Sequence, residues 1–314
     1  MTLLTLRRVV PVVPDTRITI TDLAPTAGLS PAEERLLIRV LGLGRVAVAS
    51  HLTGTEMLLR AGDAALHAAD RSAVRYLIHA HTLQHVTPPG VAITGALRRK
   101  LGLSRSRAFA LSHLGCVAGL YAVRLCDTLL RSEPPGSTAL VIAGDRVPAA
   151  EARVLRGASM LGDAAAGVLV GHGGDGDTVI GFAHRTLGKY YQARYMGPEL
   201  RRQYLEAYVP AMAGVMSSAV RDAGLTIDDI ALVLPHNVNR YSWVAIARHL
   251  GLPTSRVYLD NVTEIGHCFG ADPFINLSTA RAAGAVVRGD NLLLASAGEG
   301  ATFNAMVVRA AAEG

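Results

Sequence analysis

The chain has 314 residues, 50% of them hydrophobic and 18% charged, so it has enough apolar side chains for a large core and global disorder is excluded. Its formal net charge is +6, but 29 of the 31 basic residues are arginines spread along the chain, and aromatic residues make up 5%. Because basic and aromatic side chains do not cluster together, we expect no nucleic-acid binding.

Short apolar runs alternate with longer segments of helical periodicity. Buried strands are expected at 139–143, 166–170, 230–234 and 291–295, and helices at 56–69, 117–131, 199–223 and 241–250. This alternation is typical of α/β proteins, in which helices cover buried strands.

An internal repeat predicts that the chain is duplicated. LGLSRSRAF at 101–109 and LGLPTSRVY at 250–258 are identical at five of nine positions, and a reactive side chain follows each copy, Cys116 in the first and His267 in the second. Two packed halves would bring both side chains to one interface. The glycine-rich segment 171–177 is the expected boundary, so we predict one half over 1–172 and another over 173–314.

Cys116 is the candidate nucleophile. It lies between glycines at the predicted start of a helix, where backbone N–H groups favour the thiolate. Cys126 lies inside that helix and is expected to be inert. The three cysteines are too widely spaced for a disulfide framework, which suits a reducing compartment. The N-terminus lacks a signal-peptide pattern and no stretch approaches about 18 apolar residues, so we expect a cytoplasmic protein without a membrane span.

Two histidines follow predicted structural boundaries in the second half. His236 comes directly after a buried strand, where open α/β sheets place their ligand sites, and His267 lies in a glycine-rich loop. Both also have structural interpretations, and Asp272 is interpreted as the cap of a helix that Pro273 opens. Cys116, His236, His267 and Cys268 show no metal-ligand spacing, so we expect neither a metal nor a cofactor. The glycine run at 298–303 is a turn or an oxyanion donor.

Taken in order, the motifs GCVAG, LGDAAAGVLVG, PHNVNR and GEGATFNAMVVR resemble those of the ketoacyl-acyl carrier protein synthase III family, in the thiolase superfamily of condensing enzymes. The resemblance implies a thiolase-like fold, in which two duplicated α/β halves form a layered α-β-α-β-α core. It places Cys116 on the acylated cysteine, His236 on the catalytic histidine and Asn239 on a substrate-binding asparagine. Gly300 falls near the residue that completes the oxyanion hole with the N–H of Cys116.

The chain departs from that family at two places. His267 occupies the position of the usual catalytic asparagine, which implies the Cys-His-His set of the related elongating ketosynthases. The family's N-terminal stretch that grips coenzyme A is poorly matched, since the single tryptophan is Trp243. We therefore expect a carrier protein as donor, docked on a basic rim that includes Arg98, Arg99, Arg240 and Arg248.

The resemblance implies a ketosynthase in fatty-acid-like or polyketide biosynthesis. Cys116 would be acylated by a thioester, and a malonyl-type thioester would then be decarboxylated and condensed with the acyl group. We expect His267 to serve this second half-reaction more than the first. A homodimer is expected, with a heterodimer with a related subunit as the alternative. Two other functions remain open: acyl transfer from Cys116 to an alcohol or amine, and a non-catalytic ketosynthase-like partner subunit.

Overall fold

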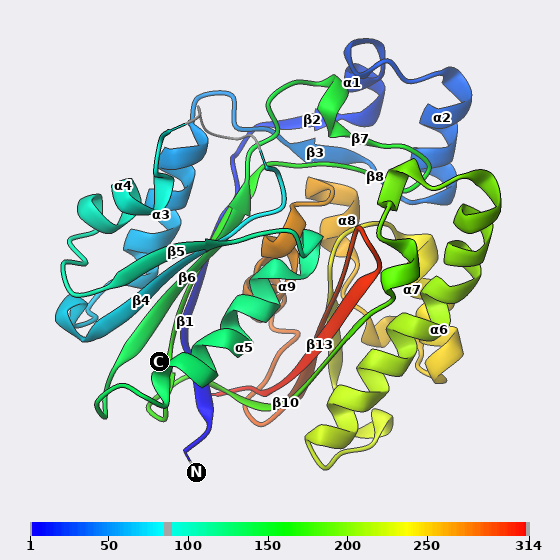
Figure 1. The fold of residues 1–314 in the computed structure, drawn as a ribbon. Helices are drawn as coiled ribbons and strands as arrows, with labels where there is room; N and C mark the ends of the chain where they lie inside the picture. Colours follow the sequence, from blue (N-terminus) through cyan, green and yellow to red (C-terminus); the bar gives the residue numbers. More distant parts are fainter. Residues whose placement is uncertain (1, 85–89, 312–314) are drawn as a thin grey trace.

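The protein, seen here as a computed structural model, is described over residues 2–84 and 90–311. Within these residues nine strands form one continuous sheet (Figure 1). The first half of the chain contributes β1 (Leu4–Val12), β4 (Val74–Ala80), β5 (Arg107–Leu111), β6 (Thr138–Asp145) and β9 (Ala164–His172). The second half contributes β10 (Asp177–Thr186), β11 (Leu232–Pro235), β12 (Asn291–Gly298) and β13 (Thr302–Arg309). Two short strand pairs lie apart: β2 (Arg17–Thr19) with β3 (Arg45–Ala47), and β7 (Val154–Leu155) with β8 (Ser159–Met160).

The helices connect these strands. They are α1 (Ile20–Ala27), α2 (Pro31–Arg35), α3 (Gly54–Ala65), α4 (Ile93–Lys100), α5 (Ala118–Leu130), α6 (Pro198–Asp222), α7 (Arg240–Leu250), α8 (Asp260–Ile265) and α9 (Asp272–Ala282). Among the helices of the described ranges, none combines the length and apolarity that crossing a membrane requires.

The two halves of the sheet have the same strand order, which confirms the predicted duplication. In the first half the order is β5-β4-β6-β9-β1, with β5, β4 and β6 parallel and β9 antiparallel to β6 and β1. In the second half it is β11-β12-β13-β10, and Val257 makes a parallel bridge to β11 in the place that β5 occupies beside β4. The repeated nine-residue segments thus lead into equivalent edge positions.

Helices α5 and α9 form the central layer between the two halves (Figure 1). Their apolar side chains, including Val123 and Phe274, belong to one core cluster with β6 and β12. Gly119 and Gly270 allow the two helical segments to meet, because a Cβ on Gly119 would lie 2.3 Å from the carbonyl oxygen of Gly270. Two further clusters bury α3 and α4 on the outer face of the first half, and α6 and α7 on that of the second. The layered α-β-α-β-α core is therefore as expected.

The predicted elements correspond to observed ones. The four strands are parts of β6, β9, β11 and β12, and the four helices are α3, α5, α6 and α7. Residues 173–176, within the predicted boundary 171–177, connect β9 to β10, and both strands pair with β1. The sheet is continuous across this connection, so the division at residue 172 stays a prediction.

Candidate active site

Cys116 lies where the two halves of the protein meet. It is the middle residue of a 3₁₀ turn (Gly115–Val117) that leads directly into α5, and its side chain is almost buried. Strands of the other half hold the backbone of this turn: Ser296 Oγ donates to the carbonyl of Cys116 at 2.8 Å, and Asn304 Nδ2 donates to that of Val117 at 3.0 Å. The sulfur therefore occupies a fixed position at a helix start, which favours a reactive thiolate.

The glycine turn after β12 packs against the Gly115–Val117 turn, called here the nucleophile turn because it carries the candidate nucleophile. A Cβ on Gly298 would lie 2.2 Å from the carbonyl oxygen of Leu114, and one on Gly115 would lie 2.8 Å from the backbone nitrogen of Glu299. Gly300 lines the same pocket as Cys116. A glycine suits this position because its φ is +86°, and not because a side chain would lack space. The direct backbone contact with the nucleophile turn thus comes from residues 298–299, and the oxyanion role of Gly300 stays a prediction.

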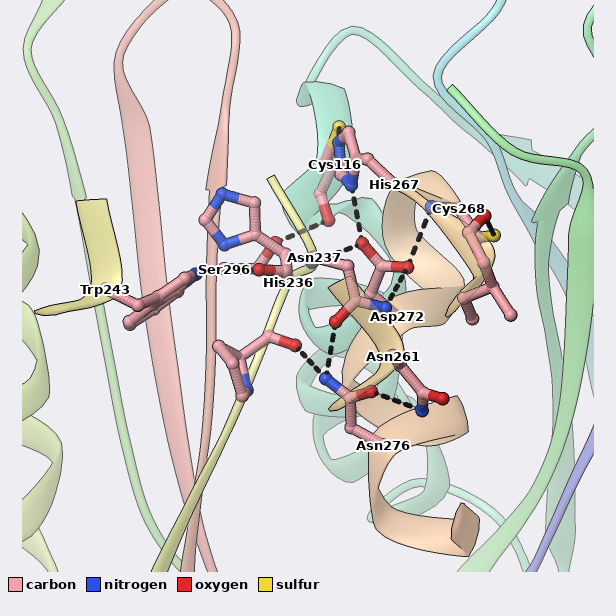
Figure 2. A network of polar contacts seen from close by, with 12 residues as sticks. Cys116, His236, Asn237, Trp243, Asn261, His267, Cys268, Asp272, Asn276 and Ser296 are labelled. Carbon is pink, nitrogen blue, oxygen red and sulfur yellow. Dashed lines mark hydrogen bonds and ion pairs between the residues drawn. The ribbon is translucent and has the colours of Figure 1, made fainter. Parts of the chain in front are cut away.

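His267 is the ring in contact with the thiol. Its Nε2 lies 3.0 Å from Cys116 Sγ, and its Nδ1 donates to Asp272 Oδ2 at 2.5 Å. Figure 2 shows this chain of contacts running from the sulfur through the imidazole to the carboxylate. The three side chains have the nucleophile, base and orienting acid arrangement of a catalytic triad.

Asp272 is the centre of a buried network (Figure 2). Besides His267, its carboxylate accepts hydrogen bonds from the backbone N–H groups of Asn237 and Cys268 and from the amide of Asn237. Asn276 extends the network by donating to Asn237 Oδ1 and to the carbonyl of Pro235. Because its lone pairs are satisfied in this way, the carboxylate is held in place behind the histidine.

The interpretation of Asp272 as a helix cap is wrong. Asp272 is the first residue of α9, Ala271 holds the cap position, and no side chain makes the cap hydrogen bond. The chain turns sharply through Gly266 and Phe269, both at positive φ, which brings the carboxylate back onto a histidine five residues earlier. His267 and Asp272 could both be read from the sequence, but the backbone path that brings their side chains together could not.

The charges at this site favour an ion pair. Burial by itself would lower the pKa of His267, but the negative charges at Cys116 and Asp272 and the hydrogen bonds to both hold its pKa well above the usual value. His267 is therefore protonated at neutral pH, with its positive charge 3.0 Å from the sulfur. The ring thus lies within hydrogen-bond reach of the sulfur, as does an imidazole that activates a thiol nucleophile.

A segment before β9 fixes the backbone of His267. The N–H of His267 donates to the carbonyl of Met160 at 3.0 Å, and the N–H of Gly162 donates to the carbonyl of His267 at 2.9 Å. Close by, the buried side chains of Arg153 and Asp163 form an ion pair at 2.8 Å. The LGDAAAG motif thus supports the histidine from behind, and Gly162 is needed because a Cβ there would lie 2.3 Å from the carbonyl oxygen of Ile265.

His236 lies beside His267 rather than against the thiol. The two ring centroids are 5.6 Å apart, and Trp243 Nε1 donates to the carbonyl of His236 at 2.8 Å. Burial, and then the positive charge of His267, hold the pKa of His236 well below its usual value, so the ring is neutral. His267 was expected to serve the second half-reaction more than the first, yet it is the histidine in contact with the thiol, and its role in each step stays a prediction.

Asn239 has a structural role in the described chain. Its Oδ1 accepts from the N–H of Ser242 as the cap of α7, and its Nδ2 donates to the carbonyl of Ala158 at 3.0 Å. It also lines the pocket, so substrate binding by Asn239 stays a prediction. Cys126 and Cys268 are fully buried, and burial raises the pKa of both thiols. Of the three cysteines, Cys116 alone lines the pocket described here.

A pocket of about 670 Å³ leads from the surface to Cys116, His236 and His267. Its walls come from the segment 36–41, the segment 154–158, the first turns of α6, and the glycine turn at 297–300. The arginines that line it in the described residues are Arg156, Arg194 and Arg201, which differ from the predicted rim. Nowhere in the described ranges do three or more His, Cys, Asp or Glu side chains group so that they could hold a metal ion.

A doubled α/β fold with a cysteine at the start of a central helix defines the thiolase-like class of proteins. The family described as the C-terminal region of 3-oxoacyl-[acyl-carrier-protein (ACP)] synthase III matches residues 220–310. The β-ketoacyl-[acyl-carrier-protein] synthase III of Rhizorhabdus wittichii is 32% identical over 226 residues, which cover 67% of this chain and 69% of that protein. The chain therefore belongs to the β-ketoacyl-[acyl-carrier-protein] synthase III family, as the motifs indicated.

Two solved structures share the whole fold. ChlB3, described as an acyltransferase, superposes with a TM-score of 0.89 at 20% identity, covering 99% of this chain and 98% of that one. The priming β-ketosynthase of the R1128 polyketide pathway superposes with a TM-score of 0.82 at 20% identity, covering 99% and 97%. At 20% identity, both comparisons show a shared fold and nothing more.

Proposed function

We propose that this protein is an acyltransferase that carries an acyl group on Cys116 and passes it to an alcohol or amine. The observation that carries the proposal is the contact chain from Cys116 through His267 to Asp272, with distances of 3.0 Å and 2.5 Å. A carboxylate bound to one ring nitrogen raises the proton affinity of the other, and this suits a base that must take a proton from an acceptor. Decarboxylation needs only hydrogen-bond donors, for which such a carboxylate is not required.

The proposed reaction has two half-reactions. The Cys116 thiolate attacks the donor thioester, the bond from the acyl carbon to the donor sulfur breaks, and the departing thiolate takes the proton of His267. The acceptor then loses its proton to the neutral His267 Nε2 as its oxygen or nitrogen attacks the acyl carbon. Cys116 leaves as thiolate, which restores the original ion pair with His267. Backbone N–H groups of the nucleophile turn and of the turn after β12 would hold the oxyanion in both steps.

Decarboxylative condensation is the second candidate, and His236 is the observation that favours it. This neutral ring lines the pocket beside His267, so the two histidines could both donate to the carbonyl of a malonyl-type thioester. The products of the two reactions differ. Condensation releases carbon dioxide and gives a 3-oxoacyl thioester, whereas acyl transfer gives an ester or amide.

The functions are separated by supplying an acyl thioester with either malonyl-coenzyme A or a panel of small alcohols and amines. We expect a mass adduct on the enzyme that an alcohol or amine removes as an ester or amide, with no carbon dioxide released from the malonyl thioester. Release of carbon dioxide together with a 3-oxoacyl product would replace the proposal with condensation. An enzyme that forms no adduct with any donor would support the non-catalytic partner subunit.

We propose a carrier protein as the donor, in fatty-acid-like or polyketide biosynthesis. The relatives' name refers to an acyl carrier protein, and arginines lie along the pocket of this chain. Two of these arginines, Arg156 and Arg194, pair with Glu33 and Glu299. Arg201 is the third arginine among the described residues that line the pocket. A basic entrance suits an acidic protein that carries its acyl group on a flexible arm.

We also propose a homodimer in which the nucleophile-bearing halves are in contact. Strand β5 is the edge of the sheet in that half and pairs with β4 on one side. Exposed sheet edges in natural proteins are usually covered or paired. Light scattering at micromolar concentration should therefore give about twice the chain mass of 33.0 kDa. A 33.0 kDa species would contradict the dimer, and restoration of a larger species by a related subunit would indicate the heterodimer.

A further inference from the structure

Tyr208 brings a phenol from α6 into the pocket that contains Cys116. Its hydroxyl lies 3.4 Å from His236 Nε2, and its ring packs edge-on against Phe303 and Tyr204 at centroid distances of 5.6 Å and 5.9 Å. Both Tyr208 and His236 line the pocket that leads to Cys116. The aromatic packing fixes the direction of the hydroxyl, so it belongs to the site as much as the histidines do.

The polar atoms of this pair have few partners. His236 is 2% exposed, and the Tyr208 hydroxyl is the only hydrogen-bond partner that its Nε2 has among the described residues. The contact between Tyr208 and Nε2 is longer than the roughly 2.8 Å that is usual when a hydroxyl donates in a hydrogen bond. Buried polar groups without good partners are rare in folded proteins and need an explanation, such as a ligand that completes them.

The protonation states of the pair suit an oxygen ligand. Burial first, and then the charges of neighbouring groups, raise the pKa of Tyr208 well above its usual value, so the phenol keeps its proton and can donate it. His236 is neutral and can donate or accept through Nε2. An oxygen atom can lie about 2.8 Å from both the hydroxyl oxygen and Nε2, because these two atoms are 3.4 Å apart and the three atoms then form a triangle.

We propose that Tyr208 and His236 together bind an oxygen of the second substrate and hold that substrate against acyl-Cys116. His267 is already engaged with the thiol and with Asp272, whereas Tyr208 and His236 line the same pocket and have only a long contact with each other, at 3.4 Å. The inference rests on the proposed two-step reaction. It concerns the second half-reaction and makes Tyr208 a substrate-binding residue.

Tyr208→Phe tests the proposal with the two half-reactions measured separately. Acyl-N-acetylcysteamine loads the enzyme, and intact mass follows the adduct. Discharge is then measured against the concentration of 1,2-propanediol or of malonyl-N-acetylcysteamine, so that either chemistry is covered. We expect loading at the wild-type rate and discharge slowed by about 10- to 100-fold, with a higher half-saturating concentration, as for one hydrogen bond lost from a buried site.

Tyr190→Phe is the matched control. Tyr190 is also a packed tyrosine whose hydroxyl contacts an oxygen at 3.4 Å, that of Gln203, but it does not line the pocket. It should leave both half-reactions at wild-type rates. If Tyr208→Phe slows loading and discharge equally, or leaves discharge unchanged, the phenol does not bind the second substrate. Failure of the proposed function is distinguishable, because the wild-type enzyme itself would then fail to load or to discharge.

Discussion

Cys116→Ala is expected to abolish the acyl adduct and reduce turnover to background. Cys116 lies at the start of α5 and at the end of the pocket, beside a protonated His267. The expected reason for the loss is that no other group can take the acyl carbon, since a neighbouring imidazole activates only a nucleophile within hydrogen-bond reach. Intact-mass analysis after incubation with acyl thioesters on coenzyme A and on carrier proteins measures the adduct and identifies the donor at once.

The other two cysteines provide the controls for this experiment. Cys126 is buried inside α5, and Cys268 is buried behind the histidine with its sulfur toward the carbonyl of Ile265. Cys126→Ala and Cys268→Ala should keep the adduct, although each removes a core sulfur and is expected to cost some stability. An adduct that persists in Cys116→Ala would assign the nucleophile to another residue.

Asp272→Asn is expected to lower turnover by up to about 10⁴-fold, the size of the effect when the acid of a Ser-His-Asp triad is replaced by its amide. An asparagine at this position would present an N–H to His267 Nδ1 and so favour the tautomer whose Nε2 carries the proton. That tautomer cannot take a proton from an acceptor. The measurement is the rate at which the preloaded enzyme transfers its acyl group, across a range of pH.

Asp145→Asn is the matched control for Asp272. Like Asp272, Asp145 is buried; it ends β6, accepts backbone N–H bonds from Thr82 and Leu83, and acts on His267 only through its charge, without a hydrogen bond to the ring in the described residues. It should change the transfer rate little, and the thermal stability of both variants shows whether either has unfolded. His267→Ala should slow loading as well as transfer. Transfer at the wild-type rate in Asp272→Asn would exclude His267 as the base.

A large part of the fold was predictable because it depends on local patterns. The apolar runs that became β6, β9 and β12 are buried on both faces, which produces continuous hydrophobic segments. Strands β1, β5 and β10 were missed, since they are only partly buried and carry arginine and other polar residues in an irregular pattern. Strands β4 and β13 were missed as well, although they are almost fully buried. Helix α9 was predicted only from its start at Pro273, because its buried residues lie all round the helix and give little amphipathic signal.

The sequence alone determined the order of the family motifs and the duplication, and it predicted Cys116 as the nucleophile, because each is encoded in neighbouring residues. Only the tertiary structure decided which histidine touches the thiol, since Cys116 and His267 are 151 residues apart and lie on different halves of the molecule. It also turned Asp272 from an expected helix cap into the acid behind His267, and brought Tyr208 of α6 to His236. The contact between Cys116 and His267 depends on packing α5 and α9 between the two halves, a long-range arrangement that no local pattern specifies.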